Sequence, residues 1–113
     1  MQCQLARIIL FSADVQRLAQ FYQDMLGLPV IRTEQGWVEL NAGGCSLAIH
    51  AGASKPGNRP PKLSFYAADV AAARASLIRK GVATLGPIKS AGTFNMCDGQ
   101  DPDGNPIQIS SRR

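Results

Sequence analysis

Apolar and polar positions along the chain follow the same order twice. Each half has an alternating, strand-like run, then Ala-Asp-Val, then a helical stretch that stops at a glycine. Arg7–Val15 aligns without a gap with Lys62–Val70. A repeat in so short a chain indicates two copies of one supersecondary unit that share a core. We therefore expect a pocket between the copies, with the equivalent residues Arg7 and Lys62 facing each other across it.

The first half reads as a βαβββ unit. A β-branched and apolar run predicts a strand at Leu5–Phe11. Asp14 is a suitable N-cap for the amphipathic helix that follows, and Gly27 is its stop. Turn-forming residues then separate three short strands, predicted at Pro29–Thr33, Trp37–Leu40 and Ser46–His50.

The second half repeats this order after a linker. Residues 52–61 are dense in glycine and proline, which continue neither a helix nor a strand. A strand is predicted at Lys62–Ala67, and a helix runs from its cap at Asp69 to Gly81. Gly86–Gly92 is predicted to be a loop and a candidate flap. The remaining strands are predicted at Ala83–Leu85, Thr93–Cys97 and Pro106–Ser110.

These elements predict one domain over residues 1–113, with module one at 1–51, a linker at 52–61 and module two at 62–113. The acidic segment Asp101–Gly104 is interpreted as a turn inside module two. An EF-hand loop needs carboxylates at alternate positions and a late glutamate, and both are missing. Proline in second place and glycine in fourth fit a type I turn that connects two hairpin strands.

The composition is that of an ordinary globular protein. Of the 113 residues 45% are hydrophobic and 18% charged. No apolar run reaches the roughly 18 residues of a membrane helix, and the N-terminus lacks the pattern of a signal peptide. Cys3, Cys45 and Cys97 form no C-x-x-C pair, which argues against a disulfide framework or a zinc knuckle. We expect a cytoplasmic protein with no membrane partner.

The formal net charge of +4 does not predict a nucleic-acid partner. Basic residues are scattered, and only Arg79-Lys80 and Arg112-Arg113 are adjacent. A surface that follows phosphates has clustered basic residues with aromatic residues between them. The charge instead favours small anionic ligands.

Two segments together resemble the vicinal oxygen chelate superfamily, which includes the glyoxalases, bleomycin-resistance proteins and extradiol dioxygenases. They are Phe21–Leu28, where the first helix runs into Leu-Gly, and Asp101–Ile107, before the last strand. The resemblance covers almost the whole chain. It implies an α+β fold in which two βαβββ modules form a curled mixed-sheet cup, within one chain or across a domain-swapped dimer. We expect a homodimer.

Enzymes of that superfamily usually hold a divalent metal in the cup, with one side chain from the first and fourth strands of each unit. The resemblance carries these positions onto Arg7, Ala48, Lys62 and Gln108, with His50 two residues beyond Ala48 on the same face. Arginine has no lone pair to donate, alanine has no donor atom, and lysine would have to lose its proton. A carboxamide, alone or with His50, falls short of the three protein ligands of a usual catalytic metal. We therefore expect neither a metal nor another cofactor.

Strand alternation predicts which side chains line the cup. The face that carries Arg7 mixes apolar and aromatic side chains with a few polar groups, as small-molecule pockets do, whereas the opposite faces are uniformly apolar and suit a layer covered by helices. Glu39 joins this cup face. The predicted ligand-binding residues are Arg7, Ile9, Phe11, Trp37, Ala48, His50, Lys62, Ser64, Tyr66 and Gln108.

Two cations in one cup would repel each other by about 4 kcal/mol at about 4 Å in a partly screened site. A bound carboxylate, phosphate or enolate would offset that repulsion. Glu39 would do so as an internal salt bridge, and a solvent-facing Lys62 would avoid it. All three arrangements remain open at this point.

Three functions follow from these readings. The first is metal-independent binding of a small molecule, preferably an aromatic or apolar acid, as in the bleomycin-resistance branch. The alternative is a lyase or isomerase in which Arg7 and Lys62 replace the metal, while His50 or Glu39 moves the proton. The third is a scaffold with a vestigial pocket, in which Arg7 is locked to Glu39.

Overall fold

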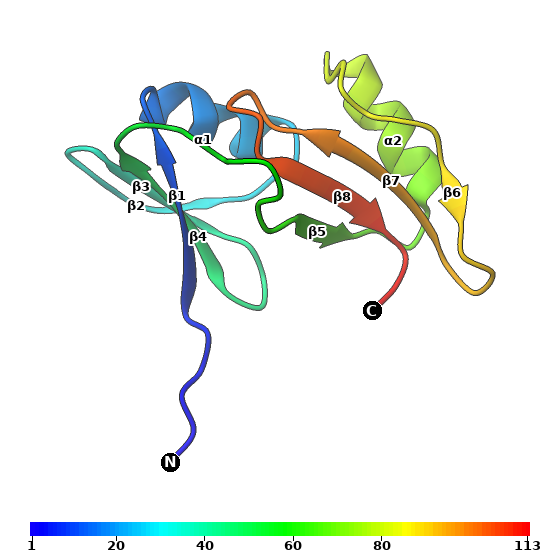
Figure 1. Ribbon diagram of the computed structural model, residues 1–113, viewed down its shortest axis with the longest axis horizontal. Helices are drawn as coiled ribbons and strands as arrows, with labels where there is room; N and C mark the ends of the chain where they lie inside the picture. The colour runs from blue at the N-terminus through cyan, green and yellow to red at the C-terminus, as the bar shows by residue number, and fades with distance from the viewer. The chain divides into compact units, whose positions relative to one another are not determined.

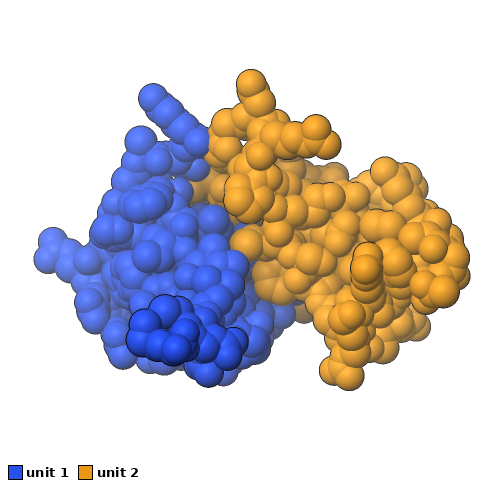
Figure 2. All heavy atoms as spheres, turned by 60° about the horizontal axis from the view of Figure 1, so that its bottom comes forward, with its two compact units in different colours: residues 1–55 blue, residues 56–113 orange.

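A computed structural model describes all 113 residues, which divide into two compact units (Figure 2). Unit 1 comprises Met1–Lys55 and unit 2 comprises Pro56–Arg113. The division lies inside the predicted linker at 52–61. Each unit contains a strand, a helix and three further strands (Figure 1). The predicted α+β fold with two βαβββ modules is confirmed.

Unit 1 forms a four-stranded mixed sheet with strand order β1-β4-β3-β2. β1 and β4 are parallel, and the other neighbours are antiparallel. The helix packs against β3, β4 and β1 and covers one face of the sheet. The elements of unit 1 are β1 (Arg7–Ser12), α1 (Val15–Asp24), β2 (Val30–Glu34), β3 (Trp37–Asn41) and β4 (Ser46–Ala51).

Unit 2 repeats this topology with strand order β5-β8-β7-β6. β5 and β8 are parallel, and the remaining pairs are antiparallel. Its helix lies against β7 and β8. The elements of unit 2 are β5 (Leu63–Tyr66), α2 (Val70–Arg79), β6 (Lys89–Ser90), β7 (Asn95–Gln100) and β8 (Pro106–Ser110).

The two helices begin and end at the residues that the sequence singled out. The carboxylates of Asp14 and Asp69 accept hydrogen bonds from the backbone N–H three residues further on, at 3.1 and 2.9 Å. These bonds satisfy donors that the first turn of a helix leaves without a partner. After each helix the chain passes through a glycine with positive φ, Gly27 at 71° and Gly81 at 101°. That conformation is costly for residues with a Cβ, so both glycines stop their helices.

The core of each unit lies between its helix and one face of its sheet. In unit 1, Leu18 and Tyr22 of α1 and Leu40 and Ile49 of the sheet have no exposed surface. In unit 2, Ile107 and Ile109 of β8 are buried beside Cys97, Val70 and Leu77. Burial raises the pKa of the Cys97 thiol, which is therefore protonated and unreactive. These are the faces that the sequence predicted to be uniformly apolar.

The predicted strand at Ala83–Leu85 is wrong. This segment runs alongside β7 without forming a strand, and Thr84 attaches it through its side chain. Thr84 Oγ1 accepts a hydrogen bond from Gln100 N at 3.0 Å and donates one to Gln100 O at 2.9 Å. A side chain thus makes the bonds that a strand would make with its backbone. Pro87, which lacks an N–H, follows directly.

The predicted loop at Gly86–Gly92 contains the short strand β6, which pairs with β7. The segment is held at its start as well, since Gly86 N donates to Asp98 O at 2.8 Å and Arg74 Nε donates to Gly86 O at 2.8 Å. These contacts argue against a freely moving flap.

The predicted turn before the last strand is confirmed. Gly104 N donates to Asp101 O at 3.0 Å and closes the turn between β7 and β8. The buried carboxylate of Asp101 accepts from the backbone N–H groups of Asp103 and Asn105, both at 2.9 Å. These bonds use the carboxylate inside the turn, as the turn interpretation requires.

Neither helix has the length and apolar character that crossing a membrane requires.

We predict that Gly99→Ala destabilises the protein because Thr84 and Leu85 pack closely against this position. A Cβ there would be 2.9 Å from Leu85 Cδ2 and 3.2 Å from Thr84 Oγ1. Overpacking of this kind costs about 1–3 kcal/mol, measurable as a lower midpoint of urea denaturation. Gly44→Ala is the matched control, since nothing lies within 4 Å of its added Cβ. Equal midpoints for the two variants would contradict the packing described here.

Candidate functional site

Each sheet has one face that its own helix does not cover, and the predicted site residues of unit 1 lie on that face. The register places Ile9 opposite Ala48 and Phe11 opposite His50. Across the next pair, Ala48 lies opposite Glu39, and His50 lies opposite Trp37. Residues two apart on a strand share a face, so these side chains form two rows across β1, β4 and β3. We call this surface the open face of unit 1.

Glu39, at the β3 end of the first row, forms an ion pair with Arg7. Arg7 Nε lies 3.3 Å from Glu39 Oε2, and Ser46 Oγ donates to the same oxygen at 2.6 Å. Glu39 is only 5% exposed. The hydrogen bond from Ser46, aided by Arg7, lowers the pKa of Glu39 below its ordinary value of 4.5, although burial opposes this shift. Glu39 is therefore ionised at neutral pH and neutralises Arg7.

The far row is aromatic. The His50 ring lies between Phe11 and Trp37, with ring centroids 5.4 and 5.5 Å away. Phe11 is 51% exposed and its neighbour Ile9 is 44% exposed. The row therefore presents aromatic surface to solvent, and nothing in it resembles a buried core.

The uncovered face of unit 2 has a different character, because its polar side chains bind one another. Lys62 Nζ lies 2.9 Å from Asp98 Oδ1, to which Gln108 Nε2 also donates at 3.2 Å. Ser64 Oγ donates to Gln108 Oε1 at 2.9 Å. Three of the predicted site residues of unit 2 thus belong to one network organised by Asp98.

The fourth predicted residue of unit 2, Tyr66, lies apart from this network. It is 50% exposed, and the guanidinium of Arg113 lies 4.7 Å from its ring centroid. Such stacking of arginine on an aromatic ring is a cation–π contact.

The two ion pairs occupy equivalent positions in the repeat. Glu39 lies opposite Ala48 on the fourth strand of unit 1, and Asp98 lies opposite Gln108 on the fourth strand of unit 2. In both units, an acid on the third strand holds the cation that precedes or begins the first strand. Of the arrangements left open by the sequence, the internal salt bridge is the one found for Arg7, and Lys62 has a salt bridge of its own.

Asp98 was missed because the predicted strand ended at Cys97, whereas β7 continues to Gln100. Its position across the hairpin from Gln108, on the same face, was the signal that would have found it. The hydrogen bond from Lys62, followed by that from Gln108, lowers the pKa of Asp98 below 3.8 against the effect of burial. Lys62 is therefore neither unpaired nor simply facing solvent.

The family model described as the Glyoxalase/Bleomycin resistance protein/Dioxygenase superfamily matches residues 4–109. The chain belongs to this superfamily. The comparison with proteins of curated function gives no significant match.

Solved structures of this superfamily share the fold over almost the whole chain. A glyoxalase/bleomycin resistance protein/dioxygenase from Nocardioides has a TM-score of 0.82 at 15% identity, over 97% of this chain and 83% of that one. Lactoylglutathione lyase from Agrobacterium tumefaciens has a TM-score of 0.77 at 16% identity, over 97% and 94%. These likenesses establish the fold alone.

A further structure is more similar in sequence. A protein of unknown function from Agrobacterium tumefaciens is 27% identical, with a TM-score of 0.80, over 97% of this chain and 94% of that one.

The residues at the superfamily's usual metal positions do not fit a divalent metal. Arg7 and Lys62 are cations in ion pairs, Ala48 has no donor atom, and the amide of Gln108 is bound to Asp98 and Ser64. No group of three His, Cys, Asp or Glu side chains lies close enough together to hold a metal ion. Hard and borderline metals need such oxygen, nitrogen or sulfur ligands.

We predict that Glu39→Gln lowers stability at neutral pH and that the difference from the wild type narrows in acid. The folded pKa of Glu39 is below its unfolded value, so its contribution is fully present above about 4.5 and is lost as the pH falls through the folded pKa. Urea denaturation at a series of pH values measures this. Glu34→Gln, an exposed glutamate on β2, is the control. A difference between Glu39→Gln and the wild type that stays constant with pH would contradict the ion pair.

Proposed function

We propose that this protein binds a small aromatic acid, without a metal, at the open face of unit 1. The observation that carries the proposal is the solvent-exposed aromatic row of Phe11, His50 and Trp37 on the same face as Arg7. Three aromatic rings from three adjacent strands offer a planar ligand stacking and edge contacts with little loss of side-chain freedom.

Arg7 is the group that would recognise the acid. Only its Nε is bonded to Glu39, and its side chain is 39% exposed. A guanidinium has five N–H donors, so its terminal nitrogens remain for the two oxygens of a carboxylate. Glu39 offsets much of the charge and fixes the orientation of the side chain. We therefore expect Arg7 to recognise the carboxylate through oriented hydrogen bonds and to attract anions only weakly from a distance.

The spacing of these groups suits one ligand. Arg7 and Phe11 lie on the same face of β1, four residues or about 13 Å apart along the strand. The arginine side chain spans part of this distance, and Ile9 and Ala48 form the apolar floor between. An acid with one or two aromatic rings would contact both ends.

The absence of a ligand set that fits a metal supports a metal-independent mode. Unit 2 supplies less to this proposal, since Lys62, Ser64 and Gln108 already satisfy one another's hydrogen bonds. Breaking that network to bind a ligand would leave polar groups without partners. The expected homodimer and cytoplasmic location stay predictions.

The alternative, a lyase or isomerase, is favoured by one observation. Glu39 Oε1 is buried and has no hydrogen-bond partner, as a proton acceptor would. The lowered pKa of Glu39 makes it a weak base, however, and both cations that would act as electrophiles are paired with acids. Turnover decides between the two, because an enzyme consumes its ligand and a binding protein does not. The scaffold hypothesis also predicts the Arg7–Glu39 pair, but an exposed aromatic row is not what a vestigial pocket would show.

We predict that 4-nitrobenzoate quenches the fluorescence of Trp37, the single tryptophan, saturably and equally with and without EDTA. Arg7→Ala should weaken this binding about tenfold or more, because it removes a charge-assisted pair, yet leave 4-nitrobenzamide unaffected. Arg17→Ala, which removes an exposed arginine from α1, is the matched control.

Because Arg7→Ala also leaves Glu39 without its cation, the double variant Arg7→Met/Glu39→Gln is needed beside it. In the double variant both replaced side chains are uncharged. This variant should bind 4-nitrobenzoate no better than 4-nitrobenzamide. Loss of wild-type binding in EDTA would contradict metal independence. Equal affinity of wild type and both variants for the acid would remove Arg7 from the site.

We also predict that Phe11→Ala weakens binding of the acid and the amide alike. Phe11 is half-exposed, so its removal takes away ligand contact and little of the core. The expected loss is about 1 kcal/mol, or several-fold in the dissociation constant, measured by the same quenching. Ile31→Ala, which removes a similarly exposed apolar side chain from β2, should have no effect. Equal effects of the two substitutions would contradict a specific aromatic row.

A further inference from the structure

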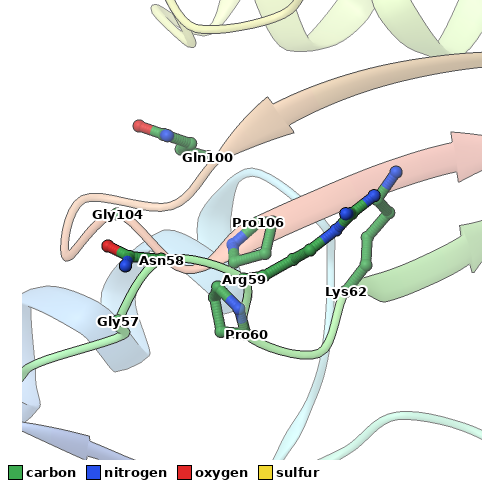
Figure 3. A pocket seen from close by; sticks show the side chains of 8 residues that line it. All are labelled: Gly57, Asn58, Arg59, Pro60, Lys62, Gln100, Gly104 and Pro106. Atoms are coloured by element: carbon green, nitrogen blue, oxygen red, sulfur yellow. The ribbon is translucent and has the colours of Figure 1, made fainter.

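Unit 2 contains a cavity of about 260 Å³ (Figure 3). One wall is the segment that leads into β5, and the other is the hairpin that joins β7 to β8. This volume lies below the roughly 300–1,000 Å³ of pockets for drug-sized ligands, so it suits a small group. The lining residues are Gly57, Asn58, Arg59, Pro60, Lys62, Gln100, Gly104 and Pro106.

The lining is basic and contains no carboxylate. Arg59 and Lys62 are its charged residues, and Asn58 and Gln100 add amide groups. Lys62 shares its charge with Asp98, which is not part of the lining, whereas Arg59 has no acidic partner. Figure 3 shows the side chains of Arg59 and Lys62 extending in the same direction. Because Asp98 pairs with Lys62 alone, the charge of Arg59 is left over, and an anion would offset it.

The walls are held in place before any ligand binds. Proline fixes the backbone at Pro60 and Pro61, and Gly57 has a φ of 81°, which only glycine adopts readily. The opposite wall is the turn that Asp101 closes with its own hydrogen bonds.

We propose that this cavity binds the phosphate group of a small molecule. Arg59 is the anchor, because a guanidinium holds two phosphate oxygens in a bidentate manner, and Lys62 adds a point charge. A phosphate dianion matches these two cations better than a carboxylate, which has one oxygen fewer and half the charge. This site uses no residue of unit 1 and needs no part of the function proposed there.

The test is a titration of the full chain with inorganic phosphate, phenyl phosphate and acetate at constant ionic strength, followed by amide NMR shifts. We expect saturable shifts at Gly57, Asn58 and Gly104 with the two phosphates and none with acetate. Arg59→Ala should weaken phosphate binding at least tenfold. Arg79→Ala, which removes an exposed cation from α2 of the same unit, should leave binding unchanged.

The titrations with phenyl phosphate and inorganic phosphate distinguish a phosphorylated small molecule from free phosphate as the ligand. Tighter binding of phenyl phosphate identifies a phosphorylated small molecule, and equal binding of inorganic phosphate identifies the free ion; either result supports the site. Acetate binding as tight as phosphate, absence of saturation, or an unchanged affinity in Arg59→Ala would overturn it. Arg59 makes no ion pair, so its removal should not unfold the chain, and an unchanged midpoint of urea denaturation would show that the variant is folded.

Discussion

In each unit the first and fourth strands run parallel and lie side by side, and a single helix covers one face of the sheet they belong to. Strand alternation then divides the side chains into two sets. Leu40 and Ile49 enter the core beneath the helix, whereas Phe11 and His50, on the same strands or their neighbours, point to the other face. The helix-covered face stabilises the unit, which leaves the other face available for ligand chemistry.

That free face carries the same electrostatic arrangement twice. Arg7 with Glu39 and Lys62 with Asp98 each join a cation to an acid on the third strand. Glu39 is buried and needs its partners Arg7 and Ser46, whereas the side chains of Lys62 and Asp98 are 45% and 38% exposed, so water screens their pair. The two cations, Arg7 and Lys62, are also at positions onto which the resemblance carries the superfamily's usual metal ligands. The duplicated topology is thus retained here with a donor set that does not fit a metal.

The two units have nonetheless diverged in what their free faces offer. Around Glu39 the neighbours are apolar or aromatic, and the row ending in Trp37 is exposed. Around Asp98 the neighbours are Gln108 and Ser64, which complete a closed polar network. One fold therefore carries two chemistries, and function has to be argued from the side chains at each site. The exposed aromatic surface of unit 1 favours ligand binding, whereas the satisfied hydrogen bonds around Asp98 in unit 2 disfavour it.

The sequence by itself determined the repeat, the βαβββ order, the caps at Asp14 and Asp69, the closed turn at Asp101 and the alternation that separates core from free face. Each depends on residues close together in the chain, whose propensities and spacing are visible directly. The ion pairs were decided by the tertiary structure, because Arg7 and Glu39 are 32 residues apart and Lys62 and Asp98 are 36 apart. Each ion pair forms only when three strands pair in the observed register. The pair of Lys62 with Asp98 also requires that β7 extends beyond Cys97. Thr84 shows the same limit: its side chain bonds to Gln100 across the sheet, and no local pattern distinguishes that contact from a strand.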